Sequence, residues 1–210
     1  MITRVHSARP LHLSVATRLI GSAANYWLAL VGDVVIAGAF LVLGVRLFSG
    51  SGVEAVVAAV AGFVAWGGIE YGVHRWVFHG PPSLARRAHA RHHADGTALI
   101  SAPVFVSAAM AAGMFAILSV LLPPGHAAFV VFGLYAGYNH YAVLHHLLHR
   151  RRSLVSRVPF LARLEQAHHF HHVHGAANYG VSTSWWDHLL GSYQPSDDSG
   201  RSRNRRTTHA

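Results

Sequence analysis

The chain has 210 residues, of which 52% are hydrophobic and only 12% are charged, a balance that points to a membrane protein rather than a soluble domain. Its formal net charge is +9, and nucleic acid is the first partner to consider for so basic a chain. The arginines, however, flank apolar runs and form no stripe with stacking aromatic side chains, so no nucleic-acid partner is expected. The absence of cysteine excludes disulfides and thiolate metal ligands.

Four apolar stretches reach or approach the length of about 20 residues that a helix needs to cross a bilayer. They cover residues 26–48, 53–73, 99–122 and 127–148. Only short turns separate the first from the second and the third from the fourth, which predicts two helical hairpins. Four such runs are too many for the buried helices of a soluble core in a chain of this length, so an all-α membrane protein is expected.

The arginines predict how these spans are oriented, because cytoplasmic loops of membrane proteins carry an excess of positive charge. All 17 basic residues are arginine, and every one except Arg46 lies before the first span, between the second and third, or after the fourth. Both termini are therefore expected in the cytoplasm, together with a helical cap made of residues 74–98 and 149–193. Residues 1–193 are expected to form one membrane domain and the polar residues 194–210 a disordered tail. The expected location is a bacterial inner membrane.

Most of the 19 histidines fall in four groups on the same predicted side as the arginines. The groups are HRWVFH (74–79), HARHH (89–93), HHLLH (145–149) and HHFHH (168–172). Helix positions i, i+3 and i+4 share a face, so each HxxHH box is expected to point three imidazoles the same way. His74 and His79 would be about 140° apart on an unbroken helix, so they either serve two metals or the helix ends between them.

Ten of these histidines are candidate metal ligands. They are His74, His79, His89, His92, His93, His145, His149, His168, His171 and His172. A tetrahedral zinc ion needs four ligands at most, so ten favour a dinuclear site with about five ligands for each ion. Imidazole ligands suit iron, zinc, copper and nickel.

Three carboxylates and one amide are placed to support these ligands. Glu70 and Glu165 each lie one helical turn before a histidine of the first or last group, Asp187 follows two tryptophans, and Asn139 lies inside the fourth span. A carboxylate that accepts the second N–H of a ligand histidine fixes its tautomer, and this is the role expected of the three acids. Asn139 is also expected to orient a ligand.

The four histidine groups and the segment NYGVSTSWWDHLLGSY (178–193) resemble the histidine boxes and the segment after the last box in the fatty acid hydroxylase and sterol desaturase superfamily of integral membrane enzymes. The resemblance covers roughly residues 60–193. HRWVFH and the stretch HHADGTALISAP (92–103) are most similar to the fatty acid 2-hydroxylase branch.

This resemblance implies that the ten histidines bind two iron ions, which zinc can replace in a structure, and that dioxygen is the oxidant. It also implies a lipid substrate that enters from the membrane. Electrons are expected from a separate donor protein of the ferredoxin or haem-carrier type, because no haem-carrier domain is fused to the chain.

The expected function is O2-dependent hydroxylation of a C–H bond in a lipid of the fatty acyl, sterol or carotenoid type. Desaturation of a lipid on the same cluster is the main alternative, because the sequence does not separate the two reactions. A metal transporter would need ligands along a path through the spans, whose middles hold few such residues. A structural zinc protein, in which the ions only join helices, is the remaining alternative.

Overall fold

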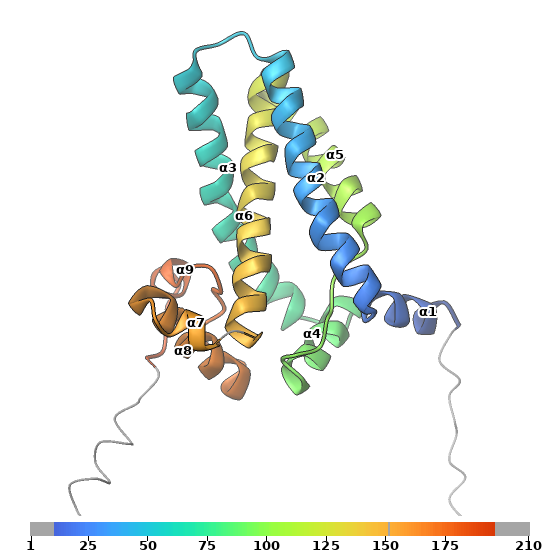
Figure 1. Ribbon diagram of the computed structural model, residues 1–210, viewed down its shortest axis with the longest axis vertical. Helices are drawn as coiled ribbons and strands as arrows, with labels where there is room; N and C mark the ends of the chain where they lie inside the picture. Colours follow the sequence, from blue (N-terminus) through green and yellow to red (C-terminus); the bar gives the residue numbers. More distant parts are fainter. Residues whose placement is uncertain (1–10, 151, 196–210) are drawn as a thin grey trace, which may run out of the picture.

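The structure is a computed structural model that describes residues 11–150 and 152–195. In this part of the chain every regular element is a helix. The elements are α1 (Leu11–Ile20), α2 (Ala23–Leu47), α3 (Gly52–Gly72), η1 (Val73–Phe78), α4 (Leu84–Ala94), α5 (Val104–Leu121), α6 (Pro124–Arg150), α7 (Arg152–Val155), α8 (Pro159–His174) and α9 (Trp185–Leu189). Figure 1 shows α2, α3, α5 and α6 side by side, with α4, α7, α8 and α9 gathered at one end of this bundle, which we call the histidine end.

Four helical segments of the described residues are long and apolar enough to cross a membrane. They are Ala23–Leu47, Gly52–Phe78, Val104–Leu121 and Pro124–Arg150. The prediction of an all-helical protein with four membrane spans is therefore confirmed. The third membrane span, α5, begins five residues later than predicted because Pro103 occupies its N-cap in an extended conformation. A proline also disfavours helical geometry in the residue before it. Most of the predicted tail lies beyond Pro195, outside the described residues, and the single domain over residues 1–193 stays a prediction.

A polar cluster ties three of the spans together. Ser107 Oγ donates to the carboxylate of Asp33, and Tyr135 Oη donates to the Ser107 carbonyl oxygen at 2.5 Å. Asn139 Nδ2 donates to the carbonyl oxygens of Asp33 and Tyr135, at 3.2 and 2.7 Å. The Ser107 hydroxyl thus gives the buried Asp33 carboxylate a partner inside the bundle, as a membrane interior requires. Asn139 thus joins α6 to α2 through its Nδ2 atom, and the expectation that it orients a ligand histidine stays a prediction.

Glycines let α3 and α6 approach each other closely. A Cβ atom on Gly133 would lie 1.9 Å from the Ala59 carbonyl oxygen, and one on Gly62 would lie 2.1 Å from the Val130 carbonyl oxygen. Both contacts are with backbone atoms, so no side-chain rotation can relieve them. Small residues at a helix–helix contact in a membrane allow this close approach.

Substituting Gly133 with alanine is therefore expected to lower the free energy of unfolding by about 1–3 kcal/mol, because the added methyl group pushes α3 and α6 apart. The matched control is Gly113→Ala in α5, where nothing lies within 4 Å of an added Cβ. Denaturation of the detergent-solubilised variants, followed by circular dichroism, measures the difference. Equal stability of the two variants would contradict the close packing of α3 on α6.

Candidate metal centre

Ten histidines at the histidine end form two groups of five. Group 1 contains His74, His79, His89, His93 and His171, and group 2 contains His92, His145, His149, His168 and His172. In each group, one nitrogen atom from every residue lies within 4.8 Å of the others. The structure thus brings together all ten histidines proposed from the sequence as ligands, and metal binding by them stays a prediction.

Helix geometry divides each HxxHH box between the two groups. His89 and His93 of α4 belong to group 1, whereas His92 belongs to group 2. The box of α8 does the reverse, because it keeps two rings in group 2 and directs His171 to group 1. Residues four apart differ by only about 40° around a helix, whereas the third ring is turned by about 60° the other way. The expectation that each box points three imidazoles the same way is therefore wrong.

A π-helical turn brings His74 and His79 into the same group. In η1, the His79 N–H donates to the His74 carbonyl oxygen at 3.2 Å, and the two rings lie 5.3 Å apart between centroids. Closing the turn from i to i+5 places on one side two residues that an α-helix would hold about 140° apart. The sequence suggested that His74 and His79 serve two different metals or that the helix ends between them. The structure instead has a π-helical turn, which brings both into group 1.

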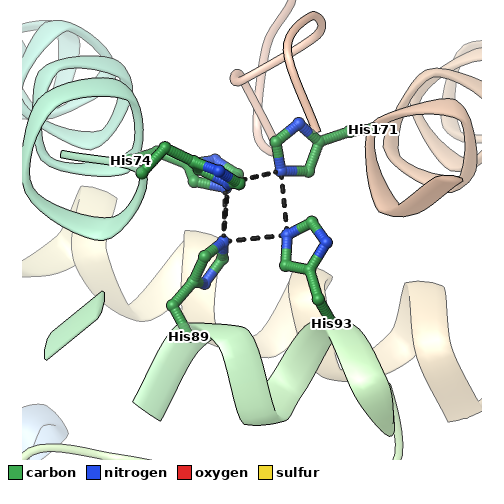
Figure 2. A group of neighbouring side chains, drawn as sticks. His74, His89, His93 and His171 are labelled. Carbon is green, nitrogen blue, oxygen red and sulfur yellow. Dashed lines mark hydrogen bonds between the residues drawn. The ribbon is translucent and has the colours of Figure 1, made fainter. Parts of the chain in front are cut away.

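The imidazoles of group 1 face a common centre. Figure 2 shows His74, His89, His93 and His171 with their ring nitrogens converging, and the connected Nε2 atoms are 3.0–3.1 Å apart. In group 2, the Nε2 atom of His149 lies 3.2 Å from that of His145 and 2.9 Å from that of His168.

Two backbone carbonyls fix the tautomer of two group 1 histidines. His74 Nδ1 donates to the Tyr179 carbonyl oxygen at 2.5 Å, and His171 Nδ1 donates to the Ala177 carbonyl oxygen at 2.7 Å. A carbonyl oxygen only accepts, so both protons are on Nδ1, and in a neutral ring Nε2 keeps its lone pair for the centre of the group. Sequence reasoning missed these carbonyls because a backbone acceptor has no residue-type signal.

Burial keeps the imidazoles neutral near pH 7. Desolvation, together with smaller contributions from neighbouring imidazoles, lowers the pKa of His171 to about 3 and that of His92 to about 3. Desolvation likewise lowers the pKa of His172 to about 2. A metal binds the deprotonated ring nitrogen, so these side chains are ready to act as ligands without first losing a proton.

The donor set fits metal ions. In group 2, the Nε2 atoms of His92 and His172 are buried without a hydrogen-bond partner, a state that costs about 1–3 kcal/mol for each atom unless a ligand occupies the space. Two nitrogens bound to one ion, with bonds of about 2.1 Å, lie about 3.0 Å apart at a right angle and about 3.4 Å apart at the tetrahedral angle, so contacts near 3.0 Å suit more than four ligands. The contacts of 2.9–3.2 Å between ring nitrogens match this spacing. Iron and zinc both suit imidazole ligands.

Glu70 contacts the loop between α8 and α9 rather than the histidines themselves. Its carboxylate accepts the backbone N–H groups of Val181 and Ser182, at 2.6 and 2.9 Å, and the Ser182 hydroxyl also donates to it. The expected bond from Glu70 to a ligand imidazole is therefore wrong, because the loop between α8 and α9 occupies its oxygens. That loop carries the carbonyls that receive His74 and His171, so Glu70 positions the ligands through the loop.

Asp187 holds the same loop from α9. Its two carboxylate oxygens accept the N–H groups of Tyr179 and Gly180, each at 2.8 Å, and Ser192 Oγ donates to it at 2.8 Å. Its expected direct contact with an imidazole is wrong for the same reason as for Glu70. Glu165, expected to support His168, lies one turn before it on α8, and its role stays a prediction.

Four helices long and apolar enough to cross a membrane, with two histidine groups at one end that could each hold a metal ion, are the features of a multi-pass membrane protein with a candidate metal site. Residues 59–192 match the model of the fatty acid hydroxylase family, and the chain belongs to this family. The resemblance expected from the histidine boxes, to the family and to its 2-hydroxylase branch, is confirmed.

The chain is similar to the fatty acid 2-hydroxylase of Macaca fascicularis, with 31% identity over 173 residues that cover 72% of this chain and 45% of that protein. It is similar to the dihydroceramide fatty acyl 2-hydroxylase FAH2 of Arabidopsis thaliana, with 27% identity over 62% of this chain and 58% of that protein. A solved structure of full-length scs7p, with only the hydroxylase domain visible, matches with a TM-score of 0.70 and 26% identity, over 85% of this chain and 69% of that one. The chain spans about half the length of the curated relatives it matches.

Proposed function

We propose that this protein is a membrane hydroxylase that inserts one oxygen atom of O2 into a C–H bond of a fatty acyl lipid, with two iron ions bound by the ten histidines. The observation that carries the proposal is the pair of five-imidazole groups at one end of a membrane bundle. Membership of the fatty acid hydroxylase family and similarity to fatty acyl 2-hydroxylases support this substrate class. The second oxygen atom leaves as water, which requires two protons and two electrons from a separate donor protein.

When bound, the two iron ions supply the oxidising power toward an unactivated C–H bond that no amino-acid side chain has. The chain itself prepares the ligands. The carbonyls of Tyr179 and Ala177 hold protons on the Nδ1 atoms of two histidines, so their Nε2 lone pairs point inward. Burial of His168 and His171 limits the access of water to the centre, which protects the reaction from side products.

The location of the site favours a lipid substrate over a transported metal. Both histidine groups lie at one end of the bundle, where an acyl chain in the bilayer can reach them, and they form no path along the spans (Figure 1). The arginines around this end support a cytoplasmic orientation for it and for both termini in a bacterial inner membrane.

Metal analysis and isotope labelling test the proposal. The detergent-purified protein is expected to contain two metal ions per chain and, after anaerobic reduction, to consume O2 in the presence of a lipid extract. With 18O2, mass spectrometry is expected to show a lipid that has gained one labelled oxygen atom. A product that has instead lost two hydrogen atoms identifies a desaturase, and a metal-loaded protein that alters no lipid rules out both activities.

A further inference from the structure

The short helix α9 presents an apolar face that the rest of the described chain leaves open. Trp185 and Leu189, four residues apart and therefore on one side of the helix, are 83% and 72% exposed. The opposite side faces the protein, where Asp187 is fully buried. An apolar face of this kind is typical of a surface that contacts a membrane or another protein.

α9 packs against the interior of a membrane span rather than beyond its end. A Cβ atom on Gly68 of α3 would lie 2.9 Å from Trp186 Cζ2, and one on Gly67 would lie 3.5 Å from Thr183 Cγ2. In Figure 1, α9 accordingly lies higher along the bundle than α8. The neighbouring surface of α3 is itself apolar, with Val64 65% and Ile69 40% exposed. The open face of α9 therefore continues the lipid-facing surface of α3.

The length of the span formed by α3 and η1 places α9 within the thickness of the bilayer. Gly52–Phe78 has 27 residues and is about 40 Å long, which exceeds the hydrocarbon thickness of about 30 Å by about 10 Å. Gly68 is ten residues before Phe78, or about 15 Å from the end of the span. Even if the whole excess projects at the histidine end, Gly68 and the Trp186 ring on it lie about 5 Å inside the hydrocarbon.

The backbone N–H groups beside α9 have hydrogen-bond partners within the protein, which suits an environment with little water. The carboxylates of Glu70 and Asp187 accept four consecutive N–H groups, those of residues 179–182. The Asp187 carbonyl oxygen accepts the N–H groups of Ser192 and Tyr193, at 2.8 and 3.1 Å. Irregular backbone at membrane depth is tolerated only where the protein itself satisfies it in this way.

We propose that α9 re-enters the membrane and that its Trp185–Leu189 face contacts lipid acyl chains. The partner of this surface is the bilayer, because the face continues the apolar surface of α3 at the depth of a membrane span. The proposal stands whether or not the protein oxidises lipid, since it depends only on packing, exposure and backbone partners.

The absence of cysteine makes a site-specific test direct. Leu189→Cys and, as the matched control, Val173→Cys on α8 introduce single thiols at positions that are 72% and 66% exposed. Each variant is labelled with a bimane fluorophore and placed in phosphatidylcholine vesicles with or without brominated acyl chains. Brominated lipid is expected to quench the Leu189→Cys label at least about twofold more than the Val173→Cys label, and aqueous iodide is expected to do the reverse.

Two outcomes would overturn the proposal. If iodide reaches both labels equally and brominated lipid reaches neither, α9 lies in water. If neither quencher reaches the label on Leu189→Cys, a protein covers the face, and energy transfer between labelled chains then tells a second copy from another partner. Trp185→Cys repeats the measurement on the same face and guards against a local effect of one label.

Discussion

Replacing His171 with alanine is expected to abolish lipid hydroxylation while the four membrane helices stay folded. The His171 side chain is fully buried, and its Nε2 atom lies 3.1 Å from the Nε2 atoms of both His79 and His93. Its loss removes a ligand whose lone pair the Ala177 carbonyl holds in place. Residues that merely orient a ligand contribute 10–100-fold to metal affinity, so loss of a ligand is expected to weaken group 1 at least about 100-fold.

The control for this variant lies on the same helix. His169 is exposed, so His169→Ala is expected to keep two ions per chain and a turnover rate within about twofold of the parent. Metal content and lipid oxidation are measured on both variants, with circular dichroism as the check on folding. Full activity in His171→Ala would refute the assignment of His171 as a ligand.

The spans and the ten histidines could be predicted because their signals are local. A run of about 20 apolar residues and a spacing of three or four along a helix depend only on nearby sequence. The partition of the boxes was predictable in principle from the same geometry, because His92 and His93 are turned about 100° from each other on α4. The π-turn of η1 was not, since no residue pattern in HRWVFH specifies an i to i+5 closure.

The roles of the carboxylates could not be read from the sequence, because their partners are far away in the chain. Glu70 lies one helical turn before His74, which suggested a bond between their side chains. Its acceptors are taken instead by Val181 and Ser182, more than a hundred residues later. Only the folded chain places that loop beside α3, and the loop then offers its carbonyls to the histidines.

Replacing Asp187 with alanine is expected to weaken metal binding in group 1 by about 10–100-fold and to leave group 2 nearly unchanged. Asp187 accepts the backbone N–H groups of Tyr179 and Gly180. Without the carboxylate, these two N–H groups are buried and unpaired, at a cost of about 1–3 kcal/mol each. The loop then holds its carbonyls less firmly. The two histidines that these carbonyls orient, His74 and His171, both belong to group 1.

The asymmetry between the groups separates a positioning role from a general loss of stability. Release of metal to a chelator is expected to become biphasic in Asp187→Ala, with one ion per chain in a fast phase. This fast phase should be absent when Asp187→Ala is combined with His171→Ala, because group 1 then starts without its ion. Gly133→Ala, which destabilises the bundle between α3 and α6, is expected to leave both ions in one slow phase. Equal acceleration of both ions in Asp187→Ala would mean that Asp187 supports the whole fold, because among the described residues the loop hydrogen-bonds to His74 and His171, both of group 1.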